Sequence, residues 1–116
     1  MKIIKFNIPI YGGEVKLIFT NDFVKASRKL GYQVDLENNN CRGMAYRFAS
    51  NDYVMMIKKH RRDDISVLAH ECLHITNYIL KDKGVGVSTK NDEAQTYLLG
   101  YIMGSIQRLK DKHKPK

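Results

Sequence analysis

The 116-residue sequence is poor in cysteine and has no long apolar run, and each absence excludes a class of protein. Two cysteines do not make the disulfide framework of a small secreted domain. No apolar stretch approaches the roughly 20 residues that cross a membrane, so we expect no membrane segment. The first ten residues carry no small-residue cleavage signal, which predicts a cytoplasmic protein.

The chain also lacks internal repeats, low-complexity linkers and any composition change that would mark a domain boundary. We therefore predict a single domain over residues 1–116, with a basic tail from about residue 108. A hydrophobic content of 43% suffices for one core.

Acidic residues are few beside basic ones, 12 against 20, which gives a net charge of +8. The positive charge concentrates in residues 58–62 and 108–116. Such clusters can bind nucleic acid or an acidic partner weakly through nonspecific electrostatics. No RNP aromatic string or zinc-knuckle pattern accompanies them. The pattern therefore favours a solvated loop and chain end over a nucleic-acid interface.

One short stretch carries a chemical pattern: His70-Glu71-Cys72-Leu73-His74 matches H-E-x-x-H. Residues four apart lie on the same face of an α-helix, so two imidazoles placed in this way can bind one Zn²⁺. Glu71 can then reach a water molecule on the same metal.

The flanking residues predict that this stretch is helical. Asp63 and Asp64 supply a capping signal at the N-terminal end. An apolar stripe of period 3.6 follows, and Lys81, Lys83 and Gly84 are typical of a helix C-terminus. The residues of the stripe are Leu68, Cys72, Ile75 and Ile79.

A catalytic zinc ion usually has three protein ligands and an open fourth position, so a third ligand is required. A second long helix is predicted downstream, with Glu93 in its first turns. A turn at residues 84–86 would let this helix return antiparallel and bring Glu93 towards the histidines. A glutamate favoured by the helix dipole alone is the alternative explanation for Glu93.

This combination resembles the gluzincin metallopeptidases, in a very small form similar to minimal phage and bacterial metallopeptidases. The string Asn91-Asp92-Glu93-Ala94 is similar to the family's glutamate segment, and the resemblance covers residues 63 to 104. It implies a zincin-like fold, with zinc ligands His70, His74 and Glu93 and the general base Glu71. Spartan-type DNA–protein crosslink proteases use a third histidine instead of a glutamate.

The chain departs from the family at Tyr97, where many gluzincins carry an aspartate that orients a histidine. Asp92 or Asn77 would then have to hold the imidazoles. A donor for the developing oxyanion is also required. Tyr97 and Tyr101 are candidates, because both share a helix face with Glu93, although ordinary packing is the favoured explanation for each one taken singly. Tyr78 is a further candidate.

Cys41 opens an alternative for the third ligand. Peptide deformylases combine H-E-x-x-H with an upstream cysteine, in a Glu-Gly-Cys-Leu-Ser segment. This chain has Asn-Asn-Cys-Arg-Gly instead. Cys72 lies two positions from both histidines and is expected in the core.

The expected fold is α+β, with a small, mostly antiparallel sheet packed against helices. Residues 2–10 and 14–20 predict a hairpin, and residues 44–50 and 53–59 predict a second strand pair. A short helix is expected over residues 23–30, and a short strand over residues 33–36.

The sequence therefore predicts a zinc metallopeptidase acting on a protein or peptide. The alternative is a non-enzymatic basic module that binds nucleic acid or an acidic partner. Glu71 favours the enzyme, because a structural zinc site does not need a carboxylate between its histidines.

Overall fold

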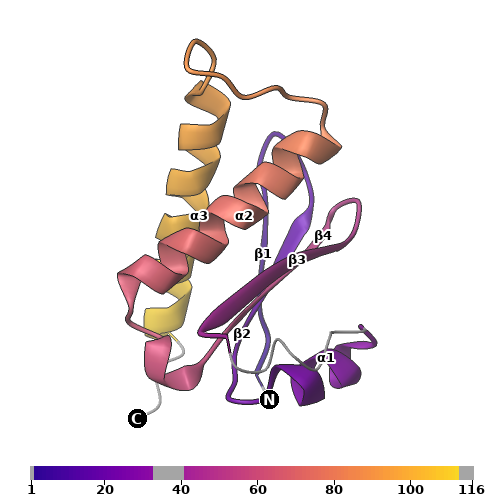
Figure 1. Ribbon diagram of the computed structural model, residues 1–116, viewed down its shortest axis with the longest axis vertical. Coiled ribbons are helices and arrows are strands. Elements are labelled where there is room, and N and C mark those ends of the chain that lie inside the picture. Colours follow the sequence, from indigo (N-terminus) through magenta and orange to yellow (C-terminus); the bar gives the residue numbers. More distant parts are fainter. Residues whose placement is uncertain (1, 33–40, 113–116) are drawn as a thin grey trace.

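A computed structural model describes residues 2–32 and 41–112 of the chain and has an α+β fold (Figure 1). Its sheet has the strand order β1-β2-β4-β3. The strands span Ile4–Asn7 (β1), Glu14–Phe19 (β2), Gly43–Ala49 (β3) and Asp52–Ile57 (β4). The helices span Phe23–Leu30 (α1), Ile65–Asp82 (α2) and Glu93–Lys112 (α3), with a 3₁₀ turn at Lys59–Arg61 (η2). The predicted fold class is confirmed.

Both predicted strand pairs form antiparallel hairpins, β1 with β2 and β3 with β4. The centre of the sheet differs from the expectation of simple hairpins, because β2 and β4 pair in parallel, from Glu14 opposite Asp52 to Phe19 opposite Ile57. A parallel pair needs a long crossover, which here contains α1 and β3. The strand predicted at residues 33–36 lies outside the described residues.

The helices cover the two faces of the sheet unequally. Alternation along β4 directs Tyr53, Met55 and Ile57 into the core shared with α2 and α3. Val54 and Met56 face the opposite side, where the α1 residues cover them. Every one of these five β4 side chains is fully buried, which gives the sheet one core on each face.

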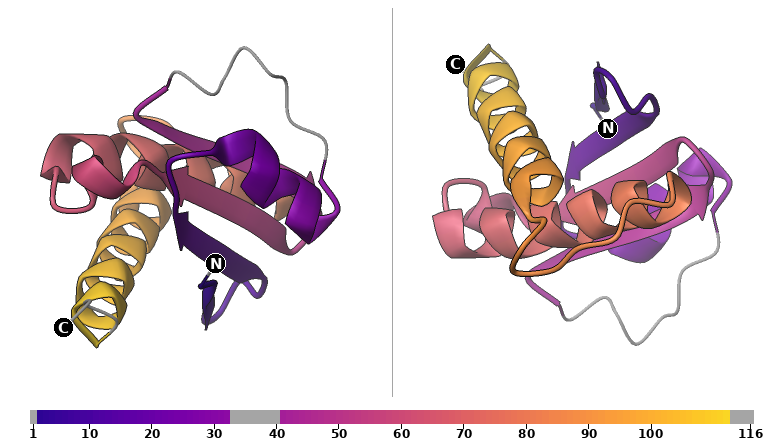
Figure 2. Two further views of the ribbon diagram at one scale, coloured as in Figure 1. Left: turned by 90° about the horizontal axis from the view of Figure 1, so that it is seen from below. Right: turned by 90° about the horizontal axis from the view of Figure 1, so that it is seen from above.

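Helix α2 begins as the sequence predicts. The Asp64 side chain accepts hydrogen bonds from the backbone N–H groups of Ser66 and Val67, which satisfies donors in the first turn. Helix α3 runs back at an angle to α2 (Figure 2). It begins at Glu93 and continues to Lys112, so the first part of the predicted basic tail is helical.

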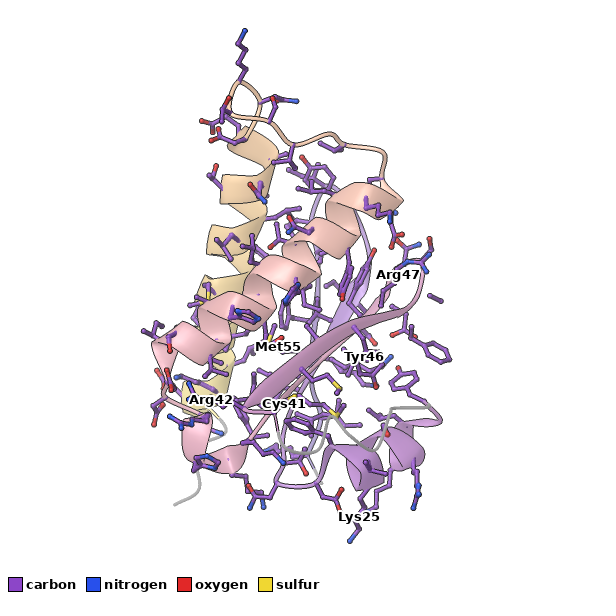
Figure 3. The ribbon with its side chains drawn as sticks, in the orientation of Figure 1. Lys25, Cys41, Arg42, Tyr46, Arg47 and Met55 are labelled. Atoms are coloured by element: carbon purple, nitrogen blue, oxygen red, sulfur yellow. The ribbon has the colours of Figure 1, made fainter. Side chains whose placement is uncertain are left out.

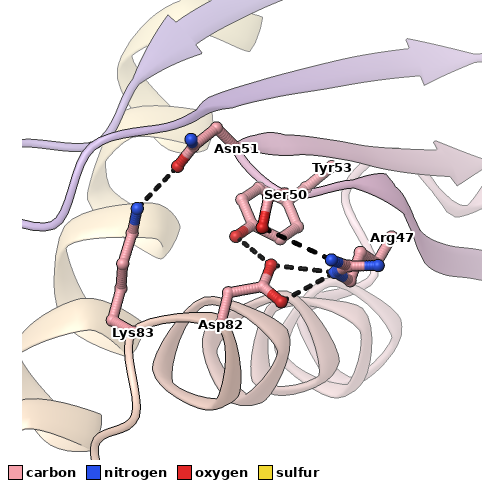
Figure 4. A network of polar contacts seen from close by, with 6 residues as sticks. All are labelled: Arg47, Ser50, Asn51, Tyr53, Asp82 and Lys83. Atoms are coloured by element: carbon pink, nitrogen blue, oxygen red, sulfur yellow. Dashed lines mark hydrogen bonds and ion pairs between the residues drawn. The ribbon is translucent and has the colours of Figure 1, made fainter.

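Both ends of α2 are fastened to other elements. At the N-terminal end, the buried Lys110 side chain of α3 lies 3.0 Å from the Asp63 carboxylate. At the C-terminal end, Asp82 accepts hydrogen bonds from Arg47 and Tyr53 of the β3–β4 hairpin (Figure 4). Helix α2 is therefore tied to α3 at its start and to the β3–β4 hairpin at its end. Among the described residues, none of the helices combines the length and apolar character that a membrane crossing requires.

Candidate metal centre

The two histidines of the H-E-x-x-H stretch lie together on the exposed face of α2. Their Nε2 atoms are 3.2 Å apart, and their ring centroids are 4.8 Å apart. Two nitrogen ligands of one tetrahedral zinc ion, each at about 2.0–2.1 Å from the metal, lie about 3.3 Å from each other. The pair therefore has a spacing that fits two ligands of one zinc ion. This spacing follows from the separation of four residues on one helix.

Glu71 completes the cluster from the buried side of the same helix. The donor atoms of His70, Glu71 and His74 all lie within 4.8 Å of one another. Glu71 is only 6% exposed, and burial raises the pKa of its carboxyl, while the two histidines lower it. A carboxyl with a raised pKa, next to a ligand pair, is suited to accept and return a proton.

A groove of about 600 Å³ runs between this part of α2 and the start of β3. Figure 3 shows Cys41 and Arg42 at one end of β3 and Arg47 at the other end. The lining residues are Cys41, Arg42, Gly43, Ser66, Val67, His70 and Glu71. The catalytic candidates therefore face a surface hollow and not a closed core.

Strand β3 forms one wall of this groove and, within the described residues, pairs with β4 alone. The Lys58 backbone N–H donates to the Arg42 carbonyl at 3.0 Å, so the polar backbone groups of Arg42 point towards β4. Those of Gly43 and Ala45 consequently point away from β4, towards the free edge. Among the described residues, no further strand pairs with this edge, and the Ala45 carbonyl accepts a hydrogen bond from the Tyr78 hydroxyl at 3.4 Å.

Gly43 allows this wall to approach the helix closely. A Cβ atom at this position would lie 2.9 Å from Ile57 Cδ1, 3.0 Å from Glu71 Cγ and 3.1 Å from Val67 Cγ1. Only glycine fits such a contact without displacing a neighbour. The sequence did not indicate this role, because the contact joins residues far apart in the chain.

Glu93, the predicted third ligand, is the first residue of α3 and is exposed. Two residues later, the Gln95 side chain donates to Asn77 Oδ1 at 2.8 Å, one helical turn beyond His74. The first turn of α3 thus lies beside the histidine-bearing part of α2. The Glu93 carboxylate is outside the cluster of donor atoms, so its role as a ligand stays a prediction.

The structure distinguishes the three candidate tyrosines. Tyr97 and Tyr101 stack on each other with ring centroids 6.4 Å apart, and the Tyr101 hydroxyl donates to the Asn7 carbonyl of β1. That hydrogen bond directs Tyr101 towards the strand and not towards the histidines. Tyr78 instead stacks on His74, with ring centroids 6.4 Å apart, and its hydroxyl lies 3.4 Å from the Ala45 carbonyl. Tyr78 is therefore the tyrosine that lies between the histidines and β3.

The two cysteines have different environments. Cys72 is fully buried, and burial raises the pKa of its thiol to about 12, as expected of a core residue. Cys41 is exposed and lines the groove beside His70 and Glu71. Its sulfur does not belong to the cluster of donor atoms.

The groups proposed to orient the imidazoles lie elsewhere. Asn77 accepts its hydrogen bond from Gln95, and the Asp92 carbonyl accepts the N–H of Thr96 at the start of α3. The first contact joins α3 to α2, and the second closes the first turn of α3. Within the described parts of the chain, the Nε2 atom of each imidazole lies against that of the other imidazole.

Comparison of the chain with family models, curated proteins and solved structures found no match.

Proposed function

We propose that this protein is a zinc-dependent metallopeptidase that hydrolyses peptide bonds in a protein or peptide. The observation that carries the proposal is the 3.2 Å spacing of the His70 and His74 Nε2 atoms, with the Glu71 carboxyl in the same cluster. The donor set fits zinc, which binds imidazole nitrogen and carboxylate oxygen. Glu93 is the proposed third ligand, because α3 begins next to the histidine-bearing part of α2.

The zinc ion and two side chains would each have a separate role in the reaction. Zinc, when bound, would polarise the substrate carbonyl and lower the pKa of a water molecule. Glu71 would take a proton from the attacking water and pass it to the leaving amine, a role that its raised pKa supports. The Tyr78 hydroxyl, which donates to the Ala45 carbonyl at 3.4 Å, would turn from that carbonyl to the oxyanion that develops on the substrate, because its ring stacks on His74.

The substrate would lie along the free edge of β3. An extended peptide can add a strand to such an edge, with main-chain hydrogen bonds to Gly43 and to the Ala45 N–H. The groove beside β3 continues past His70 and Glu71, so a peptide paired with β3 would pass the proposed reacting groups. A cytoplasmic location is part of this proposal and is tested by fractionating the producing cells.

A Glu71→Gln variant tests the mechanism. We expect purified protein to bind about one zinc ion per chain and to cleave some members of a fluorescence-quenched peptide library. Glu71→Gln should retain the zinc and lose the hydrolysis, because the amide cannot accept the proton. The double variant His70→Ala/His74→Ala should lose both. Peptide hydrolysis by Glu71→Gln at the wild-type rate would contradict the assigned mechanism.

The basic binding module is less well supported, because the cations of residues 58–62 are largely engaged within the molecule. Lys58 donates to the Asn21 carbonyl, and Arg61 lies 3.0 Å from Asp64. Arg62 donates to the Lys110 carbonyl and lies over the Phe19 ring. Binding of a fluorescent DNA oligonucleotide that persists at physiological salt would favour this alternative.

A deformylase-like hydrolase is the second candidate, and one observation favours it. Cys41 lines the same groove as His70 and Glu71, on the wall opposite α2. A thiolate from that wall would replace Glu93 as the third ligand. Hydrolysis of N-formylated peptides that is lost in Cys41→Ser, while Glu93→Ala stays active, would establish this candidate.

A further inference from the structure

A second hollow, of about 580 Å³, is separate from the groove that His70 and Glu71 line. This hollow lies at the other end of the contact between β3 and α2, and its lining residues are Tyr46, Arg47, Tyr78, Lys81 and Asp82. Tyr78 belongs both to this hollow and to the surroundings of the histidines, since its ring stacks on His74 at 6.4 Å. A ligand in the hollow would therefore be adjacent to the proposed reacting groups.

The negative charge of Asp82, the acidic residue that lines the hollow, is balanced by Arg47. Asp82 accepts two hydrogen bonds from Arg47 Nε, at 2.7 and 2.9 Å, and a third from the Tyr53 hydroxyl at 2.6 Å (Figure 4). Its side chain is 10% exposed, so the carboxylate has little contact with solvent. Arg47 and Asp82 together contribute no net charge to the hollow.

Lys81 contributes a positive charge that remains uncompensated. It is exposed and lines the hollow, and its side chain makes no ion pair or hydrogen bond with the residues that the structure describes. Lys81 follows His74 by seven residues and lies on nearly the same helix face. This separation corresponds to about 10 Å along the helix axis. An extended peptide covers that distance in about three residues.

We propose that this hollow binds a carboxylate of the peptide substrate, the side chain of an aspartate or glutamate, through Lys81. The proposal rests on the peptidase function and assigns that function a substrate class. The aromatic face of Tyr78 would cover the carbon atoms of the acidic side chain, and the Lys81 ammonium group would bind its oxygens.

The direction of β3 determines at which position of the substrate peptide the acidic residue lies. Gly43 lies beside Glu71 and Arg47 lies beside Asp82, so β3 and α2 run in the same direction. A peptide added antiparallel to β3 has its N-terminal part at the Lys81 end, and antiparallel pairing is the more stable arrangement. The acidic residue is therefore two or three residues N-terminal to the cleaved bond.

Matched quenched peptides test this assignment. They carry aspartate, asparagine or lysine three residues before the cleaved bond, each with a free or an amidated C-terminus. We expect the wild type to prefer aspartate, and Lys81→Gln to lower kcat/KM for that peptide by about fivefold, as for an exposed ion pair. Lys81→Glu should reverse the preference towards lysine. Lys112→Glu, at the end of α3, makes the same charge change and should alter none of the three rates.

Two results would overturn the assignment. Equal loss of activity towards the aspartate and asparagine peptides in Lys81→Glu would indicate that Lys81 contributes only to the overall field or to folding. A Lys81-dependent preference for the free C-terminus, independent of the aspartate, would assign the hollow to a terminal carboxylate and to a parallel peptide.

Binding measurements separate this proposal from the peptidase function. Fluorescence anisotropy with the Glu71→Gln protein reports whether the aspartate peptide binds without hydrolysis. Binding that weakens in Lys81→Glu would support the carboxylate site even if the wild type hydrolyses no peptide. Binding that is the same for all three peptides would overturn the site, whether or not hydrolysis occurs.

Discussion

Gly43 of β3 lies directly against Glu71 of α2, so closely that a Cβ atom would be 3.0 Å from Glu71 Cγ. This contact fixes the distance between the strand edge and the proposed general base. The absence of a side chain at residue 43 is thus tied to the geometry of the site.

Gly43→Ala should therefore damage both stability and activity. The new methyl group would meet Ile57 and Glu71, and such overpacking destabilises proteins by about 1–3 kcal/mol. We expect displacement of the Glu71 carboxyl to lower the hydrolysis rate while the zinc content stays unchanged. Urea unfolding and peptide hydrolysis measure the two effects.

Gly100→Ala is the matched control for this variant. Gly100 is exposed on α3, and a Cβ atom there would meet nothing within 4 Å. Because alanine favours a helix, this change should stabilise the protein by about 0.5–1 kcal/mol without altering activity. Equal effects of the two substitutions would contradict the importance of the Gly43 contact.

The N-terminal cap of α2 should make stability depend on pH. Hydrogen bonds, first from the Ser66 hydroxyl and then from backbone N–H groups and Arg61, hold the pKa of Asp64 below its usual value of 3.8. The folded protein therefore binds this proton less readily than the unfolded chain. The stabilisation is fully present above about pH 4 and is lost as pH falls through the folded pKa.

Asp64→Ala tests this linkage by thermal unfolding. The variant should have a lower Tm than the wild type at neutral pH, and the difference should shrink as the pH falls below 3.8 and through the lowered pKa of folded Asp64. Asp111→Ala removes an exposed carboxylate near the end of α3 and should not reproduce this pattern. A Tm difference that is independent of pH would show that the ionisation of Asp64 does not contribute to stability.

Tyr78→Phe should lower kcat and leave KM nearly unchanged. The hydroxyl would interact with charge that develops only in the transition state, and loss of one such donor lowers kcat by about 100-fold or more. Tyr101→Phe removes a hydroxyl that donates to the Asn7 carbonyl, so it should keep the wild-type kcat. If instead Tyr101→Phe were the slower variant, the donor would come from α3.

The local structure could be predicted from the sequence because short-range patterns determine it. Alternation and turn residues defined both hairpins, and the Asp64 cap with its apolar stripe defined α2. The spacing of His70 and His74 on that helix follows from helix geometry alone, so the cluster was also predictable. The parallel pairing of β2 with β4 was not, because it depends on packing between distant segments.

Packing between distant segments also determines where the tyrosine hydroxyls point and where the groove lies, so these features could not be predicted from local patterns. Helical spacing correctly placed Tyr97 and Tyr101 together on one face of α3, but it could not indicate which face of α3 meets α2. Tyr101 contacts β1, while Tyr78 lies beside His74 by helical spacing and reaches the Ala45 carbonyl because β3 packs along that side of α2. The alignment of β3 with α2 also places the groove lined by Cys41 and the hollow lined by Lys81 at opposite ends of the contact between these two elements.

The third zinc ligand is the most direct test of the site. Glu93 begins the helix that Gln95 fastens to Asn77, whereas Cys41 lies on the opposite wall. With Glu93 as a ligand, Glu93→Ala should weaken zinc binding by at least about tenfold, since loss even of a supporting group costs 10- to 100-fold. Cys41→Ser should leave the affinity unchanged.

Titration with a fluorescent chelator that competes for zinc measures both affinities, and removal of zinc from the wild type should abolish hydrolysis until zinc is restored. Glu93→Gln serves as the conservative control, because a neutral amide of the same size binds zinc poorly but preserves the helix start. If Cys41→Ser loses zinc while both Glu93 variants retain it, the site has a cysteine ligand, and the deformylase-like chemistry replaces the peptidase proposal.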